Sequence, residues 1–202
     1  MRTLGFVFSL AILAGARAPV QAQEPAFGIT PQVGYMFFGD HLEGPLGTSL
    51  RNAAGPLYGA QLSIRLADPV ALIGSAGYAS SDLQVGLPVL GGVDLASTSV
   101  WLADAGIELR LPLPGSVRPF IQAGAGVIHY AIDTPIVGGI DATNPAFNAG
   151  LGLDVAFAPS IGLRVLAKDY VGEFDFGDAT GFDIDGGISH NVALTVGLRI
   201  GF

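Results

Sequence analysis

The last eleven residues of the chain, VALTVGLRIGF (Val192–Phe202), alternate between apolar and small or polar side chains without a break. A repeat of two residues is the pattern of a β-strand whose two faces lie in different environments. One face is entirely apolar and ends on the aromatic Phe202, whereas the other carries Arg199 and two glycines. Because arginine is rarely buried without a partner, the second face is not expected to be an ordinary apolar core.

The same alternation recurs in eight segments along the chain. They cover residues 27–38, 57–66, 69–80, 98–111, 119–130, 146–157, 161–171 and 190–202. Tight turns are expected at residues 67–68, 113–118 and 158–160, and long connections at 39–56, 81–97, 131–145 and 172–189. A strict alternation of short and long connections is typical of membrane barrels. The sequence therefore predicts an all-β protein, an eight-stranded antiparallel up-and-down transmembrane β-barrel.

The composition favours the same fold. Half of the residues are hydrophobic and the mean hydropathy is +0.54, yet only 13% are charged, against about 25% in a soluble domain. Beyond residue 22, no uncharged stretch is as long as a transmembrane helix, and the longest runs from Pro25 to Gly39. The chain has no cysteine, so disulfides and thiol chemistry are excluded. A soluble lipocalin-like barrel is the alternative, but it would need a charged outer face.

The N-terminus resembles a secretory signal peptide. Arg2 provides a positive charge, Gly5–Gly15 is an apolar run, and Val20-Gln21-Ala22 offers a small-residue cleavage site. We therefore expect a cleaved signal over residues 1–22 and a barrel domain over residues 23–202, with a packed N-terminal helix as the alternative. Cleavage would remove two arginines and no acid, taking the formal net charge from −8 to −10.

Side chains alternate between the two faces of a strand, and this parity places polar and charged side chains, together with many glycines, on the inner face. A lumen of eight strands is only wide enough to be filled by side chains, and glycines leave room for long polar ones. We expect a structural polar network in this lumen, with a gate or proton path as the alternative. Its predicted members are Arg65, Asp104, Glu108, Arg110, Asp154, Arg164, Lys168 and Arg199.

One ion pair in this network can be predicted from the turn at residues 158–160. Asp154 and Arg164 each lie five residues from Pro159, so a symmetric hairpin places them opposite each other on the inner face. Arg199 is expected to approach the pair as a second cation. The strand over residues 161–171 fits the alternation least well, because Leu166 falls inward and Asp169 outward. A bulge or an early end is expected there.

The aromatic residues are expected to form two rings at the two ends of the strands, as in membrane barrels. The first ring is predicted to contain Phe27, Phe120, Phe157 and Phe202. The second is predicted to contain Tyr35, Phe37, Tyr58, Tyr78, Trp101, Tyr130, Phe147 and Tyr170.

Three motifs, ITPQVGY (Ile29–Tyr35), RPFIQAGAGV (Arg118–Val127) and TVGLRIGF (Thr195–Phe202), make the chain resemble the small bacterial outer-membrane β-barrels related to OmpA and OmpX. This resemblance implies export to the outer membrane, contact with its lipid and lipopolysaccharide, and a monomer. It also implies that the barrel assembly machinery reads the final strand, through Phe202, Ile200 and Leu198. The family includes structural barrels, adhesins and a few lipid enzymes, so its function stays open.

The long connections are acidic, which suggests divalent cations that bridge them to lipopolysaccharide phosphates. Asp175–Gly187 holds four aspartates but lacks the spacing of an EF-hand, so we expect a solvated loop there. The acidic residues of the connections are Asp40, Glu43, Asp82, Asp94, Asp133, Asp141, Glu173, Asp175, Asp178, Asp183 and Asp185.

Catalysis at the barrel rim would need a nucleophile and a base, and only Ser189-His190 offers both. The His-x-Ser spacing of outer-membrane lipid A deacylases is absent here. We expect no catalytic residues, cofactor or metal, and no binding of nucleic acid. The sequence favours a structural, adhesive or surface-interaction role through the long connections. A lipid-modifying enzyme or a narrow gated pore is the alternative.

Overall fold

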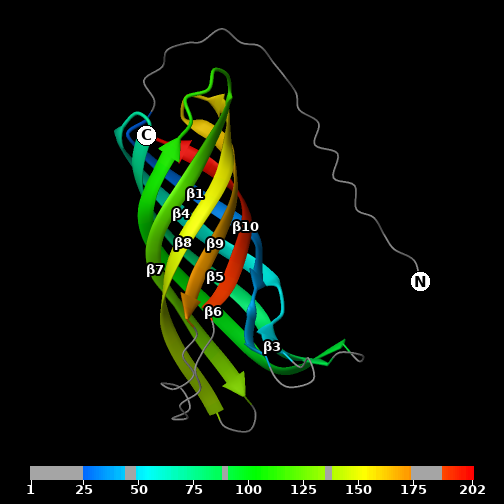
Figure 1. Cartoon of the computed structure of the whole chain (residues 1–202). Coiled ribbons are helices and arrows are strands. Elements are labelled where there is room, and N and C mark those ends of the chain that lie inside the picture. Colours follow the sequence, from blue (N-terminus) through cyan, green and yellow to red (C-terminus); the bar gives the residue numbers. More distant parts are fainter. Residues whose placement is uncertain (1–24, 44–48, 88–90, 135–137, 174–187) are drawn as a thin grey trace, which may run out of the picture.

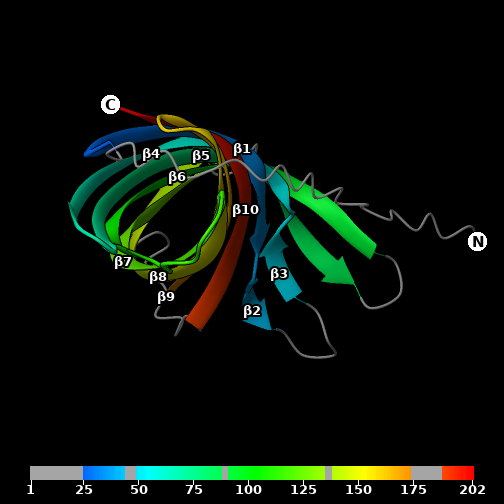
Figure 2. The same ribbon diagram turned by 90° about the horizontal axis from the view of Figure 1, so that it is seen from above.

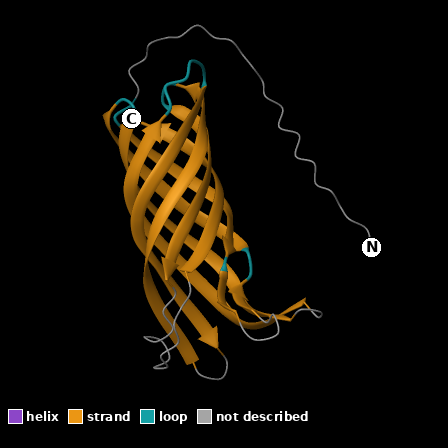
Figure 3. Cartoon of the chain, viewed as in Figure 1, coloured by secondary structure: helices purple, strands orange, loops and turns teal. Residues whose placement is uncertain are grey.

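The computed structural model describes residues 25–43, 49–87, 91–134, 138–173 and 188–202, and these fold into strands joined by short turns (Figure 3). Within these ranges, no helix is long and apolar enough to cross a membrane. The expected signal at residues 1–22 lies outside the described residues, as does the whole of Asp175–Gly187. The strands are β1 (Phe27–Phe38), β2 (Asp40–Glu43), β3 (Ser49–Asn52), β4 (Gly55–Ala67), β5 (Val70–Leu87), β6 (Gly91–Arg110), β7 (Val117–Thr134), β8 (Gly138–Ala158), β9 (Ile161–Glu173) and β10 (Ile188–Gly201).

Eight of these strands close into a barrel, and β2 and β3 form an added hairpin (Figures 1 and 2). Around the barrel, β1 pairs with β4, the order continues from β4 to β10, and β10 pairs with β1. Every pairing is antiparallel. The predicted eight-stranded antiparallel up-and-down barrel is therefore confirmed.

The two faces of the wall differ as the alternation predicts. Along β10, apolar residues such as Leu194 and Val196 are 47% and 45% exposed, whereas the intervening Thr195 and Arg199 are buried. The outer face of the whole barrel is apolar, with large hydrophobic side chains exposed on every one of its eight strands. Such a face is stable against lipid and not against water.

Short turns gather at one end of the barrel, which we call the turn end. The turns lie between β4 and β5, β6 and β7, and β8 and β9, and the first contains the cis peptide Asp68–Pro69. In the second, Gly115 has a φ of 116°, which favours glycine. The barrel also closes here, because the backbones of Phe27 and Phe202 donate hydrogen bonds to each other.

The opposite end, the hairpin end, differs from the expectation of four long loops. Residues 81–97 and 131–145 are largely strand, because β5 and β6 stay paired to Leu87–Gly91 and β7 and β8 to Thr134–Gly138. Residues 39–56 contain the β2–β3 hairpin, whose second strand pairs with β5. Their glycines and acids resemble loop composition, but the cross-strand ladder satisfies the backbone hydrogen bonds of these segments.

The bulge expected in β9 is absent, and that expectation was wrong. β9 pairs with β10 without a shift from Ile161 to Glu173, and the one shift in its pairing with β8 lies in β8, between Ala156 and Ala158 beside the turn. Leu166 is 3% exposed inside the lumen, where it packs towards Gly150. Asp169 lies on the outer face and its Oδ2 is 2.8 Å from His190 Nδ1. The two exceptions to the alternation are thus accommodated by neighbours that the local sequence does not reveal.

The aromatic rings are also only partly as expected. Phe27, Phe157 and Phe202 are exposed at the turn end, and Tyr35, Phe37, Tyr58, Trp101 and Phe147 are exposed towards the hairpin end. Tyr78 packs against Trp101, with the two rings tilted by 58° and their centroids 4.8 Å apart. Phe120, Tyr130 and Tyr170 are instead buried in the lumen, 1%, 2% and 6% exposed. Their position along the strand suggested a ring, but their parity places them on the inner face.

Candidate functional site

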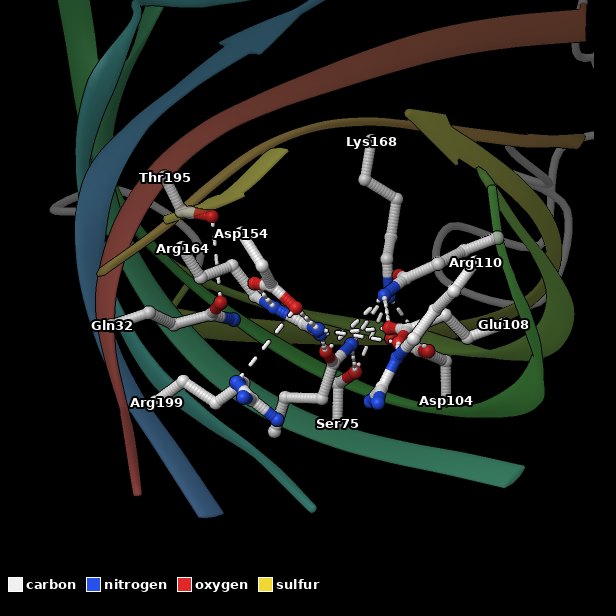
Figure 4. A network of polar contacts seen from close by, with 12 residues as sticks. Gln32, Ser75, Asp104, Glu108, Arg110, Asp154, Arg164, Lys168, Thr195 and Arg199 are labelled. Carbon is white, nitrogen blue, oxygen red and sulfur yellow. Dashed lines mark hydrogen bonds and ion pairs between the residues drawn. The ribbon is translucent and has the colours of Figure 1, made fainter. Parts of the chain in front are cut away.

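Arg164 lies at the centre of a polar network that crosses the lumen (Figure 4). Its Nε and Nη2 donate hydrogen bonds of 2.8 and 2.7 Å to the two carboxylate oxygens of Asp154. Its Nη1 and Nη2 also donate to Glu108, at 2.8 and 3.2 Å, and Nη1 donates to Gln61. The guanidinium stacks over Phe120, 4.2 Å from the ring centroid. A buried cation is thereby held by two carboxylates and an aromatic ring.

Glu108 extends the network along the inner face of β6 and β7. It accepts a 2.7 Å hydrogen bond from Arg110 Nε and a 2.9 Å bond from Gln122 Nε2. Gln122 and Gln61 also donate to each other's carbonyl oxygens at 3.2 and 3.3 Å. Glu108 itself is fully buried. All of its contacts are charge-assisted, so they offset the cost of removing its charge from water.

A second group of contacts lies nearer the middle of the barrel. Lys168 Nζ is 3.0 Å from Asp104 Oδ1, and Tyr170 donates a 2.9 Å hydrogen bond to Asp104 Oδ2. Ser75 Oγ joins this group to the first, since Lys168 and Gln61 both contact it at 3.2 Å. β5, which carries Ser75, and β9, which carries Lys168, lie four strands apart in either direction. The network therefore spans the full width of the lumen.

Glycines on the inner face make room for these long side chains. A Cβ atom at Gly152 would overlap Cζ of Phe120 and the carbonyl oxygen of Val165. A Cβ atom at Gly126 would lie 2.7 Å from Cβ of Asp104. The packing of Phe120 on Arg164 therefore depends on the absence of a side chain at Gly152 of β8.

Apolar side chains fill the lumen on the hairpin side of the network. Their cluster consists of Met36, Leu57, Ala79, Val100, Leu102, Ile128, Tyr130, Ala146, Tyr170 and Ala193, with Phe38 packed against it. Beside it lies a cavity of about 10 Å³, which is room for one water molecule. A polar layer and an apolar layer thus fill the lumen in sequence, as expected for eight strands.

The predicted network residues all face the lumen, and the structure joins most of them. The Asp154–Arg164 pair lies in register across β8 and β9 as predicted, and Arg199 Nε approaches Asp154 Oδ2 at 3.9 Å. Arg65 lies at the turn end, 3.6 Å from Asp68. Sequence reasoning missed four members of the network. Parity placed Gln61 and Gln122 inward, but both are uncharged. Ser75 carries only a short hydroxyl, and Tyr170 was assigned to an aromatic ring.

Ser189 and His190 do not form a catalytic pair. As neighbours in β10 they point to opposite faces, so Ser189 is buried in the lumen and His190 is exposed outside. His190 contacts Asp169 instead. Within the described part of the chain, no three His, Asp or Glu side chains converge as a metal ion would require. Of the acidic residues expected to attract cations, those beyond Glu173 lie outside the described residues.

Comparisons with known proteins agree with this architecture. The sequence matches the family described as outer membrane protein beta-barrel domain over residues 6–202. No curated protein matches it significantly by sequence.

Solved structures that are similar share the fold at low identity. Neisserial surface protein A has a TM-score of 0.60 and 15% identity, with 90% of this chain and 100% of that chain covered. OprG from Pseudomonas aeruginosa has a TM-score of 0.57 and 10% identity, covering 91% and 100%. The outer membrane protein AlkL, determined in lipid bilayers, has a TM-score of 0.56 and 12% identity, covering 95% and 97%.

Proposed function

Because the chain belongs to the outer membrane protein β-barrel family, we propose that it is a closed membrane anchor that acts, without catalysis, through its extracellular hairpins. The protein is located in the bacterial outer membrane. In such barrels the short turns face the periplasm and the longer connections face outward. The hairpin end therefore faces the cell exterior.

The observation that carries the proposal is the continuation of strand pairing beyond the barrel wall. At the hairpin end, residues 91–96 of β6 pair with β5 but not with β7, and residues 138–146 of β8 pair with β7 but not with β9. β2 and β3 add to the edge of β5, and this sheet leans to one side of the barrel (Figures 1 and 2). Ordered hairpins offer a preformed surface, which lowers the entropic cost of binding a partner.

The filled lumen supports an anchoring role over transport. The polar layer joins opposite strands, and the apolar cluster packs on the hairpin side of this layer. Passage of a solute would require several buried, charge-assisted hydrogen bonds to break together. The enzyme alternative has no comparable support, because Ser189 and His190 lie on opposite faces.

The chemistry of the hairpins favours a basic partner. By sequence they carry the acidic residues Asp40, Glu43, Asp82, Asp94 and Asp133. A basic protein surface, or divalent cations shared with lipopolysaccharide phosphates, would complement this charge.

The test is to shorten the hairpins while leaving the barrel intact. Ser81 lies opposite Thr98 and Ala131 opposite Asp141, so residues 82–97 or 132–140 can each be replaced by a two-residue Asn-Gly turn. Cells displaying each variant would be tested for adherence to surfaces coated with basic or acidic matrix proteins. We expect the shortened variants to lose adherence to the basic surfaces.

Leu113→Ala, in a turn at the opposite end, is the matched control and should adhere as the parent does. All variants should migrate as folded protein on gels run without boiling. Unchanged adherence of both shortened variants would contradict the proposal.

A further inference from the structure

Four arginines from four different strands surround the turn end of the lumen. Arg65 lies two residues from the end of β4, Arg110 ends β6, Arg118 is the second residue of β7, and Arg199 lies two residues from the end of β10. We call these residues the arginine ring. Arg65, Arg110 and Arg199 have side chains only 15%, 12% and 7% exposed. Positive charge is therefore concentrated at one mouth of the barrel.

The carboxylates near the ring are already engaged, mostly by Arg164, which is not a member of the ring. Asp154 and Glu108 each accept two hydrogen bonds from Arg164, and Glu108 also accepts one from the ring member Arg110. Asp104 is paired with Lys168 deeper in the lumen. The remaining acid, Asp68, is 84% exposed and 3.6 Å from Arg65. Six cations thus lie in or beside the network, against three buried carboxylates and the exposed Asp68.

Arg199 is only weakly compensated by nearby carboxylates. It is 5% exposed, and within the described residues its Nε has no hydrogen-bond partner. Its nearest carboxylate oxygen, Asp154 Oδ2, lies 3.9 Å away and already accepts a 2.7 Å bond from Arg164. Arg110, Arg118 and Arg164 are all close enough to repel its charge. A buried guanidinium in this position is costly unless another anion approaches it.

We propose that the arginine ring binds a phosphate group that enters from the turn end, on the periplasmic side of the barrel. A phosphate carries two to three acceptor oxygens and up to two negative charges, which match planar guanidinium donors and the excess of cations. Either free inorganic phosphate or the headgroup of an anionic phospholipid can supply this chemistry. The inference depends on the barrel and its orientation, and it is independent of the proposed role of the hairpins.

Binding of inorganic phosphate would be measured by calorimetry on the folded chain in zwitterionic detergent. We expect saturable binding by the parent. The dissociation constant of Arg199→Gln should be at least about tenfold higher, since a hydrogen bond to a charged group is lost. Arg51→Gln is the matched control, because it removes the same charge from β3 at the hairpin end. It should bind phosphate as the parent does.

A second arm identifies the source of the phosphate. The urea midpoint of unfolding would be compared in vesicles of phosphatidylcholine with and without phosphatidylglycerol. A rise with phosphatidylglycerol that Arg199→Gln abolishes would assign the site to a lipid headgroup, and saturation by inorganic phosphate alone would assign it to a free anion. If Arg199→Gln does not fold, as judged by gel migration, Arg118→Gln takes its place in both arms.

The proposal is overturned if neither arm shows saturable phosphate binding, which would mean that water alone solvates Arg199. It is also overturned if the ring variant behaves as the parent does, or if Arg51→Gln causes an equal loss.

Discussion

Asp154 and Arg164 face each other across β8 and β9, in register and joined by two hydrogen bonds of 2.8 and 2.7 Å. Both side chains are buried, at 3% and 1% exposure. The pair lies beside the turn between these strands, so it forms wherever this hairpin forms in its native register. Arg164 then carries the network from β8 to β4 and β6.

Replacing Asp154 by Ala should destabilise the barrel by about 3–5 kcal/mol, because it strands a buried cation and also removes the nearest carboxylate from Arg199. The measurement is the free energy of unfolding in urea, in detergent or lipid. Asp141→Ala, on the exposed side of β8, is the control and should cost far less.

A double variant separates the stranded charge from lost packing. Asp154→Leu with Arg164→Met should be more stable than Asp154→Ala alone, because the buried Arg164 cation is removed together with its partner. Equal stability of Asp154→Ala and Asp141→Ala would show that the pair is not the main electrostatic contact of the lumen.

Gly152 is expected to tolerate no side chain. Gly152→Ala would place a Cβ atom against the Phe120 ring, which supports Arg164, and should cost about 1–3 kcal/mol of unfolding free energy. Gly74→Ala is the control, since the nearest atom to its Cβ would be the Asp104 carbonyl oxygen at 3.9 Å. Similar unfolding midpoints for the two variants would argue against a tightly packed Phe120.

The fold could be predicted from the sequence because a two-residue repeat specifies both a strand and its two environments. β1 was predicted with its observed bounds, Phe27–Phe38, and the register at Asp154 followed from the turn around Pro159. The extended hairpins could not be predicted in this way. Their pairing is between segments of turn-like composition, and only the partner strand makes each segment extended.

The sequence predicted which charged side chains face the lumen, but not how the side chains in the lumen pack. Parity brought Glu108 and Arg164 to one face, but whether they meet depends on how far each side chain reaches across the barrel. Gln61 was placed inward without a role, since an uncharged amide gives no signal of which carboxylate or guanidinium it will contact. Phe120 was assigned to a ring because strand ends usually carry exposed aromatics, whereas here the ring stacks on a guanidinium.

Phe202 should matter more for assembly in cells than for stability. Its side chain is 72% exposed, and its backbone closes the barrel against Phe27. Deleting Phe202 should lower the amount of protein in the outer membrane, whereas Phe202→Tyr, which keeps a terminal aromatic, should restore it. The measurement is the amount in purified outer membranes, with refolding of the same chains in detergent as the comparison. Normal outer-membrane levels after the deletion would show that the final strand is read through other residues, such as Ile200 and Leu198.

The central claim is that the lumen is closed by the network around Arg164 and by the apolar cluster on its hairpin side. The conductance of the purified protein in planar lipid bilayers tests this claim most directly. We expect no steady conductance from the parent, and at most brief, small openings. Steady nanosiemens-scale conductance from the folded monomer would contradict the closed lumen, and with it the assignment of function to the hairpins.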